Sequence, residues 1–178
     1  PSRSSAASDV YKRQLCYFAH AGVAASSVLA PLRAVAERTF SAFLVHVAER
    51  TESHTADECL ANEARNILVA TCHLRTAVRE EAHAYLERLV PAFPWLFARS
   101  DVVATMLELT SLVGRGCDCE LTNAFLPQYT YTSTLAGISI DLSDQYAERR
   151  TLLDQVLGRV RDILARVQLD MPSELHLS

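Results

Sequence analysis

Residues 56–90, ADECLANEARNILVATCHLRTAVREEAHAYLERLV, decide the fold class of this chain. Small and apolar residues recur here every three or four positions, which is the spacing of one face of an α-helix. These positions are Leu60, Ala64, Ile67, Thr71, Val78, Ala82, Tyr85 and Leu89. The pattern is weakest over 73–76, so the stretch predicts either one long helix or two shorter ones. Pro91 and Pro94 end it.

Helices with the same spacing are predicted on both sides of this stretch. Pro31 suits the first turn of a helix, and an apolar stripe follows it over 31–50. Ser100 is a favourable N-cap for another helix, which Gly114 and Gly116 are expected to end.

A long connection and a last helix complete the predicted order of elements. Residues 114–141 lack a helical period and contain the β-favouring run QYTYTST at 128–134. They are predicted to form one long loop, with at most a short extended segment. A helix with a broad apolar stripe then runs from Ser143 towards Pro172.

The predicted fold class is therefore all-α. The chain has only 5 glycines and 6 prolines and is 49% hydrophobic, which favours long amphipathic helices over a turn-rich β sandwich. Residues 15–178 are predicted to form antiparallel amphipathic helix pairs with one long loop, stacked as a segment of a HEAT- or armadillo-like α-solenoid or packed as a bundle. The sequence contains no strict internal repeat.

Residues 1–14, PSRSSAASDVYKRQ, differ from the rest of the chain. They have no apolar period and contain the only lysine, Lys12. We interpret them as a disordered, adapter-derived leader that is not native to the protein. Without its three basic residues and one acidic residue, the remainder has 14 basic and 20 acidic residues, a net charge of −6. That charge disfavours binding to nucleic acid or to anionic lipid headgroups.

The uncharged stretch 15–32 is interpreted as a buried helix of small residues. It resembles a signal peptide, but polar residues and a glycine dilute it, and the same dilution argues against a membrane span. The five cysteines form no disulfide framework and fit reduced thiols in a cytosolic protein: Cys16, Cys59, Cys72, Cys117 and Cys119.

No residue is assigned a catalytic, cofactor-binding or metal-binding role. The glycines at 22, 114, 116, 137 and 158 form no phosphate-binding loop, and the sequence has no kinase catalytic string. Cys117 and Cys119 lack the second pair that a zinc site needs and are interpreted as thiols in a mobile loop. Cys72 and His73 are adjacent, so on one helix their side chains diverge by about 100°.

Two further features have structural interpretations. Glutamates 80, 81 and 87 with arginines 75, 79 and 88 are predicted to form i,i+4 pairs on a solvated face, and Glu63 and Arg65 are read in the same way. The apolar cluster FPWLF at 93–97 is either an interface anchor or a plug between helices.

Five segments resemble, in order, the helical region of the type III alpha phosphatidylinositol 4-kinases. They are AFLVHVAERT (42–51), LANEARNILV (60–69), YLERLVPAFPWL (85–96), VATML (103–107) and YAER (146–149). LANEARN is the most specific block. The resemblance covers about residues 23–175, and residues 114–140 match poorly.

The resemblance implies an α-solenoid segment upstream of a lipid-kinase domain. The parent enzyme would transfer the γ-phosphate of ATP, with Mg, to the 4-hydroxyl of phosphatidylinositol. It would be cytoplasmic and peripheral at the plasma membrane, in a complex with a tetratricopeptide-repeat scaffold and hyccin. The implied partner of this chain is the remainder of the kinase. No catalytic residue carries over.

Three functions remain open from the sequence. The leading one is a non-catalytic scaffold segment of such a kinase. The second is a free-standing helical adaptor whose apolar stripes close on themselves. The third is an enzyme that uses a cysteine or histidine, which would require a pocket containing Cys72 or Cys117 beside a histidine.

Overall fold

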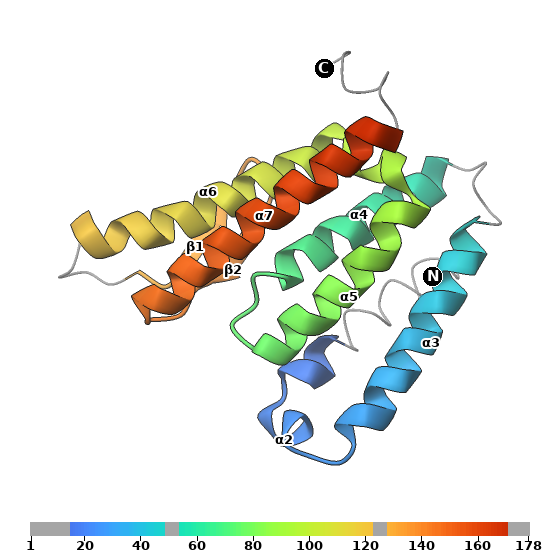
Figure 1. Ribbon diagram of the computed structural model, residues 1–178, viewed down its shortest axis with the longest axis horizontal. Coiled ribbons are helices and arrows are strands. Elements are labelled where there is room, and N and C mark those ends of the chain that lie inside the picture. The colour runs from blue at the N-terminus through green and yellow to red at the C-terminus, as the bar shows by residue number, and fades with distance from the viewer. Residues whose placement is uncertain (1–14, 49–53, 123–127, 171–178) are drawn as a thin grey trace.

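The computed structural model describes residues 15–48, 54–122 and 128–170 (Figure 1). The predicted leader, 1–14, lies outside them. Residues 15–19 are helical. The further elements are α2 (Ala21–Ala24), α3 (Leu29–Ala48), α4 (His54–Ala70), α5 (Thr76–Ala92), the 3-10 helix η1 (Pro94–Ala98), α6 (Ser100–Thr122), β1 (Thr130–Ser133), β2 (Ile138–Asp141) and α7 (Tyr146–Asp170). The predicted all-α fold is confirmed, with one small hairpin added.

The helices form two pairs with α3 at one side. A short turn joins α4 to α5, and α6 lies along α7 (Figure 1). The pairs meet where α4 packs against α6, and α3 packs against α5. This order places α4, α5 and η1 in the middle of the molecule.

The stretch 56–90 forms two helices, separated by the turn 71–75. The backbone N–H of Arg75 donates to His73 Nδ1 (3.0 Å). The Arg79 guanidinium donates to the carbonyl oxygens of His73 (2.8 Å) and Leu74 (2.9 Å), which α4 and α5 leave without helical partners. The turn is thus fixed by the His73 side chain within it and by the Arg79 side chain of α5. α5 ends at Ala92, as Pro91 and Pro94 predicted.

The prediction that a helix stops at Gly114 and Gly116 is wrong, because α6 continues to Thr122. Glycine inside a helix costs only about 1 kcal/mol relative to alanine, and packing can offset that. At Gly116 the missing side chain makes room: a Cβ there would collide with Leu142 Cδ1 and approach the Tyr131 ring. Glycine therefore marks a close approach to the hairpin rather than a helix end.

The predicted loop 114–141 is consequently much shorter than expected. Its first nine residues belong to α6, and its second half forms an antiparallel hairpin in which Tyr131 pairs with Ile140. β1 lies within the predicted extended segment 128–134, whereas β2 was not predicted. Gly137, with φ of 64°, allows the tight turn between the strands. Tyr131, Ile140 and Leu142 are buried against the helices.

The cluster at 93–97 forms a plug between helices. It folds mainly as η1, which contacts α4, α5, α6 and α7. Leu96 and Phe97 are fully buried, and Phe93 packs edge-on against Trp95 with ring centroids 6.5 Å apart. Of the two interpretations offered by the sequence, the structure selects the plug.

The stretch 15–32 does not form the buried helix that its composition predicted. It is divided among the helical residues 15–19, α2 and the beginning of α3. Phe18 is buried, but Tyr17 and Val28 are exposed. In the part of the chain that the structure describes, no helix combines the length and hydropathy needed to cross a bilayer.

Candidate functional site

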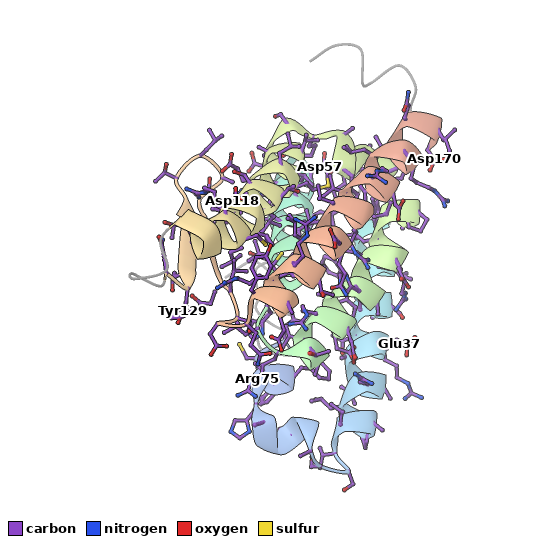
Figure 2. All side chains as sticks on the ribbon, turned by 60° about the vertical axis from the view of Figure 1, so that its left-hand side comes forward. Glu37, Asp57, Arg75, Asp118, Tyr129 and Asp170 are labelled. Carbon is purple, nitrogen blue, oxygen red and sulfur yellow. The ribbon has the colours of Figure 1, made fainter. Side chains whose placement is uncertain are left out.

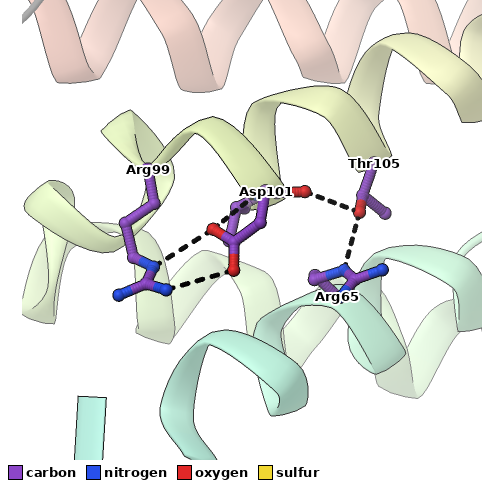
Figure 3. Close-up of polar contacts among 5 residues, drawn as sticks. Arg65, Arg99, Asp101 and Thr105 are labelled. Carbon is purple, nitrogen blue, oxygen red and sulfur yellow. Dashed lines mark hydrogen bonds and ion pairs between the residues drawn. The ribbon is translucent and has the colours of Figure 1, made fainter. Parts of the chain in front are cut away.

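A group of polar contacts joins the two helix pairs (Figure 3). Arg65 of α4 donates through Nε to Thr105 Oγ1 of α6 (2.9 Å) and through Nη2 to the carbonyl oxygen of Ala136 in the hairpin turn. Thr105 is fully buried and donates in turn to the carbonyl oxygen of Asp101 (2.9 Å). One guanidinium thus connects α4, α6 and the hairpin.

The first turn of α6 is fixed beside this junction (Figure 3). Arg99 and Asp101 form a two-pronged ion pair with both N–O distances at 3.1 Å. Hydrogen bonding by Arg99 holds the pKa of the Asp101 carboxyl below its ordinary value. Asp101 Oδ1 also accepts the N–H of Val102 (3.0 Å), one of the free donors of a helix N-terminus. These contacts cap the N-terminus of α6.

The interpretation of Glu63 and Arg65 as a solvated pair is wrong. Glu63 is buried, and Arg65 reaches across to α6 and the hairpin. The sequence contained a signal for this position, since Arg65 lies at helical spacing with Ala61 and Leu68, both buried. A charged residue on an apolar line of a helix indicates a partner across an interface.

The predicted i,i+4 pairing of Glu80 and Glu81 is also wrong, because both glutamates bind Arg33 of α3. The distance from Arg33 Nη2 to Glu80 Oε2 is 2.9 Å, and Nε contacts Glu81. Burial raises the pKa of Glu81 above its ordinary value, although Arg33 acts against this. Arg88 lies over the Phe40 ring, 5.3 Å from its centroid. These groups link α3 to α5.

Other charged side chains do lie on a solvated surface. Figure 2 shows Glu37 of α3, Arg75 of the turn before α5 and Asp118 of α6 on the outside of the molecule, and all three are exposed. Water solvates an exposed charge, so an ion pair there adds little stability. The distinction between this surface and the junction is therefore one of burial and not of residue type.

Cys72 and His73 border two cavities, of about 270 and 400 Å³, so the pocket required for a thiol enzyme is present. The electrostatics oppose that chemistry. Burial raises the pKa of the Cys72 thiol to about 11, so the reactive thiolate is scarce at neutral pH. His73 Nδ1 already accepts the Arg75 N–H, so this nitrogen is not free to act as a base. The geometry does not support a nucleophile here.

Cys117 and Cys119 lie in α6 and not in the mobile loop that the sequence predicted. Two positions along a helix place side chains about 200° apart, so the thiols diverge. Cys117 is buried, and burial raises the pKa of its thiol. Within the described ranges, no three His, Cys, Asp or Glu side chains gather closely enough to hold a metal ion.

His83 of α5 is half-buried near Arg159 of α7. Among the described residues, its Nδ1 atom has no hydrogen-bond partner. Burial, and then the positive charges of Arg159 and Arg79, lower the pKa of His83 to about 4. The ring is therefore neutral at pH 7. Its protonation at lower pH should affect the stability of the fold, and it forms no binding site with its described neighbours.

Comparison with known proteins gives one informative similarity. No protein-family profile matches the chain. The chain is 26% identical over 146 residues to phosphatidylinositol 4-kinase stt4 of the fission yeast Schizosaccharomyces pombe. That region is 81% of this chain but only 8% of the yeast protein. The similarity indicates a region related to part of that kinase.

Proposed function

We propose that the chain is a non-catalytic helical scaffold segment of a phosphatidylinositol 4-kinase, the enzyme that phosphorylates phosphatidylinositol at the 4-position with ATP. The similarity to one small part of the yeast kinase supports the parentage. The sequence motifs that bind nucleotide phosphates have no counterpart in this chain. In this proposal ATP and Mg bind elsewhere in the parent protein.

The observation that carries the scaffold role is the order of helix contacts. α4 packs against its pair partner α5 and against α6, while α3 packs against α5 and at most weakly against α6 or α7. Contacts only between adjacent helix pairs are typical of a stacked α-solenoid. In such a fold each pair is stabilised by its interface with the next pair. The Arg65 junction fixes the step between two such pairs.

The proposed partners are those that the resemblance to this kinase family implies. The remainder of the kinase chain would adjoin the helix pairs, and the tetratricopeptide-repeat scaffold and hyccin would associate with the same parent. The parent would then lie in the cytoplasm, at the plasma membrane through that complex. Co-purification of the full-length protein with these subunits, before and after deletion of residues 54–170, tests this arrangement.

Sequencing the full-length transcript tests the parentage most simply. We expect the reading frame to continue beyond Ser178 into a lipid-kinase domain with its phosphate-binding and catalytic loops. A stop codon shortly after Ser178 in the mature transcript would contradict the proposal.

The free-standing adaptor is the second candidate, and the hydrophobic core supports it. The core is continuous from Phe18 to Val167, which is compatible with independent folding. An adaptor should be monomeric, should unfold in one cooperative transition and should leave a hydrophobic dye unbound. A scaffold segment removed from its neighbours should instead bind the dye or self-associate, because apolar helix faces remain open.

A further inference from the structure

The larger of the two cavities beside Cys72 lies where three parts of the chain meet. The helical residues 15–19 cover one side, the C-terminal half of α4 with the following turn forms the floor, and β2 closes the third side. Its volume of about 400 Å³ lies within the range of small-molecule sites in proteins.

The walls of this cavity are mainly apolar. Val78, Ile140 and Cys72 are buried, and Val69 and Ala70 pack against the same core. Burial keeps Cys72 a neutral thiol, so this wall carries no charge at pH 7. An apolar body placed here would remove both its own surface and that of the walls from water, which is favourable.

The polar groups of the cavity lie at its rim. Asp141 is the only carboxylate among the described residues that line the cavity, and none of these is a lysine or arginine. Its Oδ1 accepts a hydrogen bond from Thr130 (2.7 Å), and a carboxylate can accept several. His73 lies on the same rim, and burial followed by Arg79 lowers its pKa, so the ring is neutral at pH 7. The lining therefore carries a single charge, that of Asp141, while Arg79 and Arg75 stand outside the lining and act on His73.

We propose that this cavity is a binding site for a small molecule with a compact apolar body and an ammonium end group. The body lies between residues 15–19 and α4, and the ammonium group faces Asp141. The adjoining cavity, which also contacts Asp141 and His73, is lined by Arg79, Arg149 and Glu148 as well, so its two arginines balance its two carboxylates. The proposal is independent of the parentage of the chain.

Two probes with the same body and opposite charges test the site. The affinities of 2-naphthylmethylammonium and 2-naphthoate for the full chain are measured at pH 7 by ligand-observed NMR. We expect the ammonium probe to bind about tenfold more tightly, since one end group is attracted to the carboxylate and the other repelled. In Asp141→Asn, which keeps an acceptor for Thr130, this ratio should fall below about threefold. Equal affinities in the original chain, or an unchanged ratio in the variant, would overturn the proposal.

A pair of tryptophan variants locates the bound probe. Ala70→Trp fills the cavity and should abolish binding of the ammonium probe. Gly158→Trp adds the same side chain to the open groove between α5 and α7, where a Cβ would meet nothing within 4 Å, and should leave binding unchanged. Binding retained by folded Ala70→Trp, or lost in folded Gly158→Trp, contradicts the assigned location.

Alkylation of Cys16 provides a readout without substitution. This thiol is exposed and lines the cavity, whereas Cys59 lies in the first half of α4. A saturating concentration of the ammonium probe should slow the reaction of iodoacetamide with Cys16 at least about threefold. The alkylation rate of Cys59 should stay unchanged. Peptide mass spectrometry measures both rates. If Ala70→Trp does not fold, an unaltered Cys16 rate refutes the site.

Discussion

The α4–α5 pair and the α6–α7 pair have similar apolar spacing but different burial. All eight stripe residues predicted for 56–90 are buried, the most exposed being Thr71 at 4%. On the other pair, Leu107 of α6 is 55% exposed and Leu157 of α7 is 41% exposed, although both are large apolar residues of predicted helices.

Position in the molecule accounts for this difference. α5 has α3 beside it, α4 has α6, and η1 contacts both, so the inner pair has neighbours on several sides. Among the described elements, the α6–α7 pair has neighbours on one side, formed by α4, α5, η1 and the hairpin, and none is described on its opposite side. Apolar spacing therefore locates a helix, whereas its neighbours determine which apolar positions lose contact with water.

The same substitution in each pair should give the largest contrast. Leu89→Ala removes a fully buried side chain of α5 and should lower the free energy of unfolding by about 3 kcal/mol. Leu107→Ala should change it by less than about 0.5 kcal/mol, because that side chain is already half in water. Urea denaturation followed by circular dichroism measures both. Equal losses would remove the distinction between the pairs.

The junction between the pairs should be the next most sensitive region. Arg65→Met leaves buried Thr105 and the Ala136 carbonyl without the guanidinium and should reduce stability by about 2 kcal/mol. Amide exchange in the hairpin should accelerate as well. The control Arg75→Met removes an exposed charge and should have little effect. A similar loss in both variants would mean that Arg65 acts only through net charge.

Two glycines of α6 should respond in opposite directions. Gly114→Ala has open space for a Cβ and should raise the unfolding free energy by up to about 1 kcal/mol through helix propensity. Gly116→Ala must displace Leu142 and should lower it by about 1 kcal/mol. Thermal denaturation of the two variants measures both changes. Stabilisation by both would show that the hairpin does not pack closely on α6.

The smallest expected effect is a pH dependence from His83. The pKa of His83 is about 4 in the folded chain and 6.5 for an unperturbed histidine, so the unfolded chain binds this proton more readily. Stability should therefore be fully present above pH 6.5 and decline as the pH falls towards 4. Solvent screening of a half-buried ring limits this loss to about 1 kcal/mol. The unfolding free energy of His83→Gln should fall less than that of the original chain over this pH range. Parallel curves of unfolding free energy against pH for the two proteins would exclude the effect.

The sequence predicted most of the fold because local spacing dominates long helices. It located α3, α5 and α7 within a few residues and identified the stripe of α4 and α5. It failed at Gly116, where contact with Leu142, 26 residues away, outweighs the local helix-ending tendency. β2 was missed for a similar reason, since a short strand depends on its partner.

The site was less predictable than the fold. Arg65 was assigned to a solvated surface, but it lies among buried positions of α4 and pairs with α6 and the hairpin. Helical spacing indicates that such an arginine is near a core, and only the packing of helices identifies its partner. The cavity at Asp141 had no sequence signal, because its walls come from residues 15–19, α4 and β2.

A photocrosslinking residue at Leu107 in the full-length protein tests the proposed scaffold role most directly. If α6 is one step in a longer helical stack, benzoylphenylalanine at this half-exposed position should crosslink to a segment of the same polypeptide outside residues 15–170. Recovery of the full-length protein without an intrachain crosslink at Leu107 would contradict the account.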